Sequence, residues 1–188
     1  MERCSWCGAD ELYVKYHDEE WGVPVHDDKK HFEFLLLESA QAGLSWLTIL
    51  RKRENYRLAY DDFDAAKISR YDDEKYEELL NNKGIVRNKL KIRASINNAV
   101  LFLKIQEEFG SFDRYIWSFI DNKPVVNNWS VISEVPATSG FADRVSADLK
   151  ARGFKFMGPT IVYAHLQATG LINDHIKGCF RHDTAKQV

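Results

Sequence analysis

The chain has 188 residues, a formal net charge of −2 at pH 7 and a sequence pI near 6.3. This balance excludes a strongly basic surface over the whole molecule, so any attraction to nucleic acid has to come from a local patch. No apolar run approaches the roughly 20 residues of a membrane span, and no secretory leader precedes the three cysteines. We therefore expect a cytoplasmic protein without a membrane partner and without a disulfide framework.

Aromatic residues make up 13% of the chain, with five Trp, eight Tyr and eleven Phe. Some of these side chains must pack a core, and the excess can line a pocket that stacks planar ligands. We expect one domain over residues 1–188, built as two closely packed lobes.

Residues 1–30 are rich in turns and aromatic side chains, and they contain Cys4 and Cys7 in a Cys-x-x-Cys pattern followed by His17. His175 and Cys179 are four residues apart near the other end of the chain, a spacing that two metal ligands can use. A complete zinc site needs about four ligands, and these five are one more than needed. One of the two N-terminal cysteines is therefore expected to be idle.

Helical spacing predicts a helix from His31 that breaks near Gly43, with Asp27 able to cap its start. Ser45 can cap a second helix that begins at Trp46. Glu38 falls inside an apolar run of the first helix. The pattern leaves two alternatives open for this carboxyl group, an exposed stripe or the wall of a pocket.

Amphipathic helices are predicted within residues 54–82, followed by a basic helix that Gly110 ends and a short helix over 112–120. Lys83 to Lys104 holds six Lys or Arg and no acid, whereas Asp61 to Glu78 holds eight acids and three bases. This segregation is compatible with one side that faces DNA, or simply with solvated helix faces. Residues 122–139 read as a long loop and 141–152 as a helix. Few strand alternations occur, so the predicted fold class is all-α.

Residues 152–160 predict a tight hairpin before an apolar helix over 161–171. A glycine in such a hairpin lets backbone N–H groups approach a phosphate closely. Hairpins between core helices are also common without any ligand, so this pattern is weak by itself.

Longer motifs resemble the bacterial 3-methyladenine DNA glycosylase I family, within the helix-hairpin-helix DNA glycosylase superfamily. The resemblance runs from residue 1 to about 182 and rests on these stretches: Met1-Glu2-Arg3-Cys4-x-Trp6, Tyr16-His17-Asp18-x-Glu20-Trp21-Gly22-Val23-Pro24, Glu38-x-x-Gln41-Ala42-Gly43-Leu44-Ser45-Trp46, Lys52-Arg53-Glu54-Asn55-Tyr56, Arg152-Gly153-Phe154-Lys155-Phe156-x-Gly158 and Asn173-Asp174-His175-x-x-Gly178-Cys179.

The resemblance implies an all-α helix-hairpin-helix fold in which one zinc ion joins the two ends of the chain, about 1–25 and 173–183. Its ligands would be Cys4, His17, His175 and Cys179, which makes Cys7 a spare thiol. Four protein ligands leave no open position, so this zinc would be structural.

The family also implies the reaction, which is hydrolysis of the N-glycosidic bond of 3-methyladenine in alkylated double-stranded DNA, by a monomeric, monofunctional enzyme that releases the free base. Tyr16, Glu38 and Trp46 match the base pocket of the family, with Trp6 and Trp21 as further walls. The aromatic rings would stack on a cationic base, and Glu38, assigned as the catalytic residue, would accept hydrogen bonds from the adenine edge. We expect Glu38 to be ionised, because the flipped base that it faces is both a hydrogen-bond donor and positively charged.

Asn173 stands where the wider superfamily keeps a catalytic Asp, so we do not expect a general base at this position. We expect the hairpin to grip phosphates. Leu44, at an exposed corner beside Trp46, could fill the gap left by a flipped nucleotide or could simply pack against its neighbours. The predicted DNA-contacting residues are Leu44, Phe154, Lys155, Phe156 and Gly158.

Two other functions compete with this reading. A zinc-stabilised helical module could bind DNA without chemistry, using the same hairpin and the same metal. A zinc hydrolase would need an open coordination position, which a four-ligand site does not provide.

Overall fold

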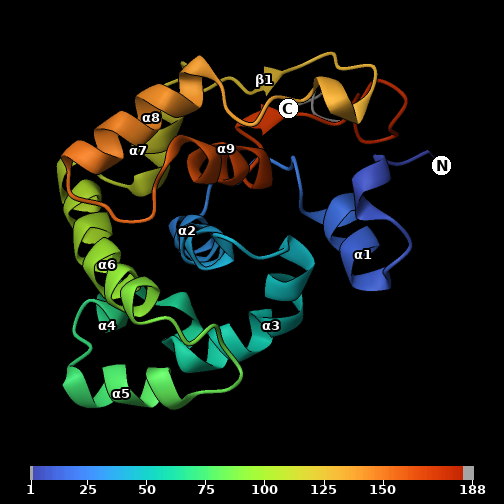
Figure 1. The fold of residues 1–188 in the computed structure, drawn as a ribbon. Helices are drawn as coiled ribbons and strands as arrows, with labels where there is room; N and C mark the ends of the chain where they lie inside the picture. The colour runs from blue at the N-terminus through green and yellow to red at the C-terminus, as the bar shows by residue number, and fades with distance from the viewer. Residues whose placement is uncertain (1, 184–188) are drawn as a thin grey trace.

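The structure, a computed structural model, describes residues 2–183 and is mostly helical within that range (Figure 1). In chain order its elements are η1 (Ser5–Cys7), α1 (Glu11–Glu19), α2 (Asp28–Gln41), α3 (Trp46–Ala59), η2 (Asp61–Phe63), α4 (Ala65–Ile68), α5 (Asp73–Asn81), α6 (Lys89–Phe109), α7 (Phe112–Ser118), β1 (Val125–Val126), η3 (Ile132–Glu134), α8 (Gly140–Ala151), α9 (Pro159–Ala168) and β2 (Ile172–Asn173). Among residues 2–183, no helix has both the length and the apolar character that crossing a bilayer requires.

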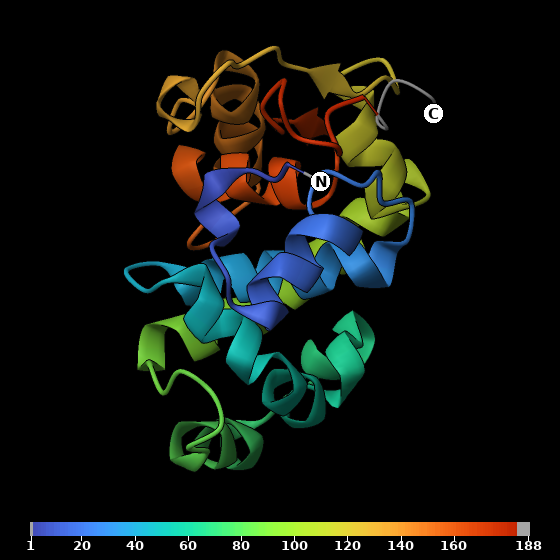
Figure 2. The same ribbon diagram turned by 90° about the vertical axis from the view of Figure 1, so that its right-hand side faces the viewer.

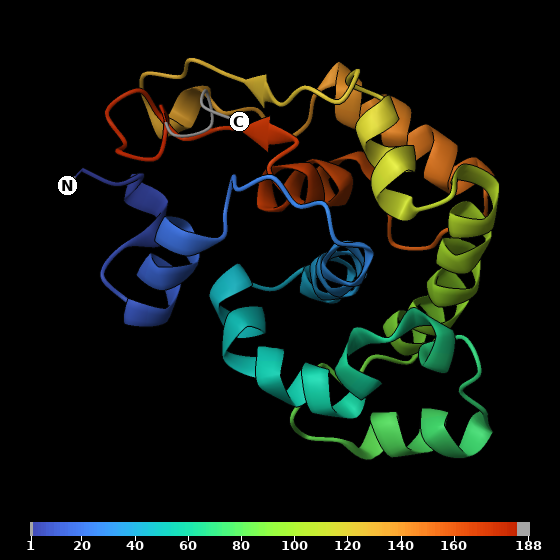
Figure 3. The same ribbon diagram turned by 180° about the vertical axis from the view of Figure 1, so that it is seen from behind.

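Helix α2 occupies the centre of the molecule. Every residue from His31 to Ala40 is buried, because α3, α6, α7 and α9 all pack against this helix. Figures 1 and 3 show α2 nearly end-on, with α3 to α6 on one side and α7 to α9 on the other. A helix enclosed on all sides can bring a polar side chain into the interior, and Glu38 lies near the end of this one.

Local capping sets the ends of the helices next to the site, as predicted. The Asp27 side chain accepts from the Lys30 N–H to start α2, and Ser45 accepts from the Thr48 N–H to start α3. Gly110 ends α6 in the left-handed conformation, with a φ of 85°.

The corner between α2 and α3 is held from a distant helix. The Lys91 ammonium group on α6 donates to the carbonyl oxygens of Ala40 and Ala42, both at 2.7 Å. These are carbonyls at the C-terminal end of α2, where a cation is favourable. Lys91 therefore fastens the corner that carries Leu44, and its charge is engaged within the protein.

The predominance of helices within residues 2–183 agrees with the predicted all-α class, to which the structure adds one very small sheet, whereas the prediction of a turn-rich N-terminus needs correction. β1 and β2 form a two-residue parallel ladder, with Val125 opposite Ile172 and Val126 opposite Asn173. This pairing ties the long loop over 122–139 to the segment after α9. Residues 11–19 form α1, which Asp10 caps through the Leu12 and Tyr13 N–H groups.

The two ends of the chain lie side by side, which Figure 2 shows in the N-terminal segment that runs beside α9. The Gly22 N–H donates to the Gln167 carbonyl at 3.0 Å, and the Phe180 N–H donates to the Glu2 carbonyl at 3.1 Å. Gly170 sits so close to this segment that a Cβ would lie 2.3 Å from the Pro24 nitrogen. Only glycine fits there.

Candidate functional site

A cavity of about 250 Å³ opens between the N-terminal segment, the central helix α2, α3, η3 and α9. All five predicted base-pocket residues meet in its wall, although they come from four separate parts of the first 46 residues. The lining consists of Trp6, Tyr13, Tyr16, Trp21, Glu38, Gln41, Trp46, Ile132, Val135, Ala164 and Gln167.

Aromatic rings form most of this wall and meet at steep angles. The Tyr16 and Trp46 rings are 5.5 Å apart with an interplanar angle of 52°, and Trp6 and Trp21 are 5.0 Å apart at 73°. In tilted and edge-to-face pairs neither ring covers the whole face of the other. The wall thus offers ring faces and edges to a flat ligand.

Glu38 is 3% exposed, and burial raises the pKa of its carboxyl group to about 8. Burial alone therefore keeps this carboxyl group mostly neutral at pH 7, and the ionised Glu38 expected opposite the flipped base requires the positive charge of that base. Its Oε2 atom is buried and has no hydrogen-bond partner within residues 2–183, and the same holds for the indole nitrogens of Trp6 and Trp46. Three unpartnered polar atoms around one cavity indicate a ligand that supplies their partners.

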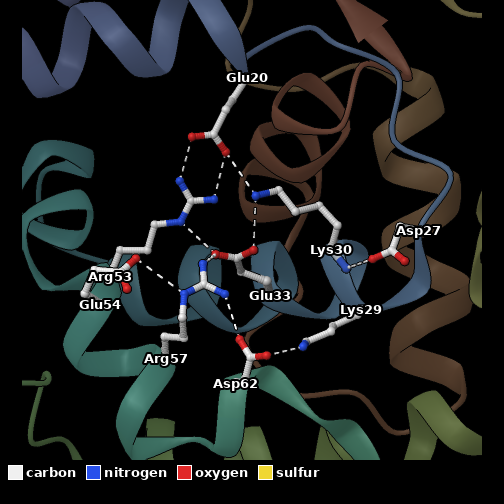
Figure 4. Close-up of polar contacts among 9 residues, drawn as sticks. All are labelled: Glu20, Asp27, Lys29, Lys30, Glu33, Arg53, Glu54, Arg57 and Asp62. Atoms are coloured by element: carbon white, nitrogen blue, oxygen red, sulfur yellow. Dashed lines mark hydrogen bonds and ion pairs between the residues drawn. The ribbon is translucent and has the colours of Figure 1, made fainter.

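An ion-pair cluster, which we call the Arg53 clamp, joins the helices that carry these residues (Figure 4). Glu20 lies just after α1, and the Arg53 guanidinium group on α3 donates to both of its carboxylate oxygens, at 2.7 and 2.8 Å. The same guanidinium group donates to Glu33 on α2 at 2.7 Å. Lys30 lies 3.1 Å from Glu20 and from Glu33. Tyr16, Glu38 and Trp46 are carried by α1, α2 and α3, so the clamp fixes their helices relative to one another.

The Arg53 clamp extends outward through Arg57, which lies 3.0 Å from Glu33 and 2.9 Å from Asp62, and Asp62 also contacts Lys29. Burial by itself would raise the pKa of Glu20, but the hydrogen bonds and charge of Arg53 outweigh it and lower that pKa to about 2. Glu20 and Glu33 therefore have the cationic partners that Glu38 lacks.

The predicted metal ligands form a second cluster, between the two ends of the chain. Cys4, His17, His175 and Cys179 are all buried, and their ligand atoms lie within 4.8 Å of one another. Sγ of Cys179 is 3.4 Å from Nδ1 of His175 and 3.5 Å from Nε2 of His17, and Sγ of Cys4 is 3.5 Å from Nδ1 of His175. A tetrahedral zinc site puts neighbouring S and N ligand atoms roughly 3.6 Å apart, so the four residues fit this metal.

The far ring nitrogen of each histidine is already occupied. Nδ1 of His17 donates to Asp18 at 2.7 Å, and Arg3 holds Asp18 in turn. Nε2 of His175 donates to the Trp21 carbonyl at 3.0 Å. These partners orient the other ring nitrogens toward the cluster, as outer partners of metal ligands do. Burial lowers the pKa of His175 to about 3, so its imidazole is neutral and able to coordinate.

Cys7 lies outside this group of four. Its thiol donates to the Cys4 carbonyl at 3.2 Å, and it is buried.

Asn173 forms its hydrogen bonds with the C-terminal loop: its Nδ2 donates to the His182 carbonyl at 3.1 Å, and its Oδ1 accepts from the His175 N–H at 3.0 Å. Asn173 is not part of the pocket wall.

The hairpin between α8 and α9 is fastened to α6. Asn98 accepts from the Lys155 N–H and donates to the Lys155 carbonyl, both at 2.9 Å. Lys155 is exposed, and a Cβ on Gly158 would meet nothing within 4 Å. Phe154 is one of the predicted DNA-contacting residues, but its side chain packs in the core. Only its backbone could therefore contact DNA. Leu44 is 41% exposed on the α2–α3 corner.

Sequence patterns missed several of these residues. Gln167, Ile132 and Val135 reach the cavity from the second half of the chain, and nothing local in their sequence marks them as pocket residues. Arg53 and Glu33 did have a signal, since Glu33, like Glu38, falls within the predicted buried helix, and a buried carboxylate requires a cationic partner.

Comparisons with known proteins identify the family of the chain. The chain matches the methyladenine glycosylase family model over residues 6–182. It is 47% identical over 179 residues to DNA-3-methyladenine glycosylase 1 of Escherichia coli (strain K12), covering 95% of this chain and 96% of that protein. It is 41% identical over 177 residues to DNA-3-methyladenine glycosylase of Haemophilus influenzae, covering 94% and 96%.

Solved structures give the same result. A crystal structure of 3-methyladenine DNA glycosylase I superposes with a TM-score of 0.93 at 46% identity, covering 96% of this chain and all of that one. A Staphylococcus aureus structure, described as the structural basis of 3-methyladenine recognition, has a TM-score of 0.93 at 38% identity and covers 97% of both chains. The chain belongs to the methyladenine glycosylase family.

Proposed function

We propose that this protein is a DNA repair glycosylase that takes 3-methyladenine out of alkylated double-stranded DNA, hydrolyses its N-glycosidic bond, and leaves an abasic site. The observation that carries the proposal is the aromatic cavity with the buried carboxyl group of Glu38 in its wall. Within residues 2–183, the Oε2 atom of this group has no hydrogen-bond partner. Relatives that carry this name, and a related structure solved in complex with 3-methyladenine, support it.

Recognition would work through charge as well as shape. A nucleotide methylated at N3 of adenine is cationic, so the faces of Tyr16 and Trp46 attract it more than they attract normal adenine. The same positive charge favours the ionised form of a nearby acid, so Glu38 would lose its proton when the base enters. The carboxylate would then accept hydrogen bonds from the adenine edge, which guanine does not match.

The chemistry would need little acid or base assistance. The bond between the sugar C1′ and the base nitrogen breaks with its electron pair moving to the base, which neutralises the positive charge. Water adds at C1′ and gives up a proton to solvent. Catalysis by this chain would consist of flipping the base, holding it, and orienting the sugar toward water. Asn173 is turned toward the backbone of the C-terminal loop, which supports a structural role for it.

Contact with DNA would involve the hairpin and the α2–α3 corner, in a helix-hairpin-helix arrangement. The exposed Lys155 and the open space around Gly158 suit phosphate groups, and the exposed Leu44 suits the gap left by the flipped nucleotide. We propose that the enzyme acts as a monomer with one domain of two packed lobes, and that it works in the cytoplasm.

A zinc ion would be held by Cys4, His17, His175 and Cys179 and would supply structural crosslinking of the chain ends. The distances between their ligand atoms and the occupied far nitrogens of both histidines support this assignment. Burial raises the pKa of the Cys4 thiol, so a thiolate at this position requires a cation such as zinc.

Release of free base tests the proposal. Duplex DNA treated with a methylating agent is incubated with the zinc-loaded protein, and the released bases are separated by chromatography. We expect free 3-methyladenine from the wild-type protein and at least about tenfold slower release from Glu38→Gln, since one hydrogen bond to a charged group is lost. Binding to alkylated DNA with no released base would instead support the DNA-binding module without chemistry.

A further inference from the structure

Asp174 is buried next to the C-terminal loop and accepts four hydrogen bonds from side chains. Asn127 and Trp129 donate to its Oδ1 at 2.7 Å each, from the loop after β1. Tyr163 and Gln167 donate to its Oδ2, at 2.5 and 2.7 Å, from consecutive turns of α9. Every contact is a donation toward the carboxylate, so each of its four partners is held with a fixed orientation.

Gln167 is the one of these four partners that also lines the cavity. Its amide has a donor end and an acceptor end, and an oxygen placed against the Asp174 carboxylate would be repelled. Nε2 must therefore face Asp174, which leaves Oε1 as the atom that is presented elsewhere. Within residues 2–183, Oε1 has no hydrogen-bond partner, and it is not among the buried unpartnered atoms, so it remains accessible on a residue that lines the cavity.

A fixed acceptor in the wall distinguishes bases by their edges. An adenine-type base carries an exocyclic amino group that donates, whereas a guanine-type base carries a carbonyl oxygen at the corresponding position. A site built to accept a hydrogen bond rejects a ligand that presents another acceptor, because both groups then remain unpaired.

We propose that Gln167 is a specificity-determining residue of the pocket, whose Oε1 accepts a hydrogen bond from an N–H donor on the flipped base. Asp174 is a positioning residue that prevents the amide from turning over. This inference rests on the proposed glycosylase activity and adds a second acceptor to the one supplied by Glu38.

The experiment compares Gln167→Met with the wild-type protein. Methionine has a similar length and volume but no acceptor, and the backbone carbonyl that receives the Gly22 N–H is unchanged. Release of 3-methyladenine and of 3-methylguanine is measured in single-turnover assays on the same methylated duplex. We expect the ratio of the two rates to fall by about tenfold in Gln167→Met.

Tyr163→Phe is the matched control, because it removes the other donor from the same Asp174 oxygen and Tyr163 is not in the cavity wall. This variant is expected to lower the melting temperature and to leave the rate ratio unchanged. A ratio within about twofold of wild type for folded Gln167→Met would overturn the inference, and would show that Gln167 only supports the fold.

Two safeguards keep the outcomes distinct. If Gln167→Met does not fold, Gln167→Asn is used instead, because it retains an amide but is too short to reach both Asp174 and the base, and the same fall in the ratio is expected. Failure of the wild-type protein to release any methylated base would count against the proposed function. An active wild type with an unchanged ratio in the variants would count against the role of Gln167 alone.

Discussion

Glu33 and Glu38 lie on the same buried helix and are equally hidden, each 3% exposed, yet the protein treats them oppositely. Glu33 contacts three cations, Lys30, Arg53 and Arg57, and belongs to the Arg53 clamp. Among residues 2–183, no cation pairs with Glu38, and burial raises its pKa to about 8. One buried carboxyl group is satisfied to hold the helices together, and the other is left unsatisfied so that a ligand can complete it.

The largest expected effect comes from the metal cluster, the other region where buried polar groups serve the fold. Cys179→Ala removes one of four ligands and is expected to lower the melting temperature by more than about 10 °C, because structural zinc contributes directly to folding. Calorimetry and metal analysis measure both consequences. Cys7→Ala, which removes a buried thiol outside the cluster, is expected to retain one zinc ion per chain; loss of zinc from that variant would contradict the ligand assignment.

The next largest effect on stability is expected when the Arg53 clamp is broken. Arg53→Met leaves Glu20 and Glu33 without their main partner and is expected to cost about 3–5 kcal/mol in the free energy of unfolding. Urea denaturation measures this cost. Arg51→Met serves as the control, since Arg51 lies two residues before Arg53 on α3 and makes an exposed ion pair with Asp10. Equal effects from the two substitutions would mean that the clamp has no special weight.

Removing the ionisable group of Glu38 is expected to raise the free energy of unfolding, whereas breaking the Arg53 clamp lowers it. The pKa of Glu38 is raised in the folded protein, so the folded state binds more protons than the unfolded state between about pH 4.5 and pH 8, and stability falls as pH rises through that window. Glu38→Gln avoids this loss. Its free energy of unfolding is expected to exceed that of wild type by an amount that grows by about 2 kcal/mol from pH 6 to pH 8 and then levels off. A constant difference across this range would show that Glu38 does not titrate there.

The smallest effect on stability is expected at the exposed rim of the pocket. Leu44→Ala should change the free energy of unfolding by less than about 0.5 kcal/mol, because the side chain is already partly in water. If Leu44 fills the gap in the DNA, base release from duplex slows while binding of free 3-methyladenine stays the same. Leu58→Ala, at an 81% exposed position on α3, provides the comparison.

The features that the sequence predicted well depend on local chemistry or on long motifs. The caps at Asp27 and Ser45 and the left-handed end at Gly110 follow from single residue types, and all three are present. The five pocket residues and the four metal ligands came from the family resemblance, and the structure brings each set together. In contrast, α1 was missed because its aromatic residues and neighbouring turns obscured the helical period.

Pairings across the chain could not be predicted. Nothing near Lys91 indicates that its ammonium group binds carbonyls some 50 residues earlier, and nothing near Gln167 indicates that Asp174 fixes its amide. The raised pKa of Glu38 could not be predicted for the same reason: it depends on how completely the folded chain buries the carboxyl group, whereas the equally buried Glu33 is placed beside Arg53.

The close approach of the two chain ends has a consequence for biosynthesis. Trp6, Tyr16, Glu38 and Trp46 leave the ribosome early, whereas α9 and the last two cysteine and histidine ligands emerge more than a hundred residues later. At about 5–20 residues per second, the growing chain carries a half-built aromatic pocket for on the order of ten seconds. The pocket therefore stays incomplete until Ala164 and Gln167 of α9 have been synthesised, and during that interval its aromatic side chains are the part most in need of protection from aggregation.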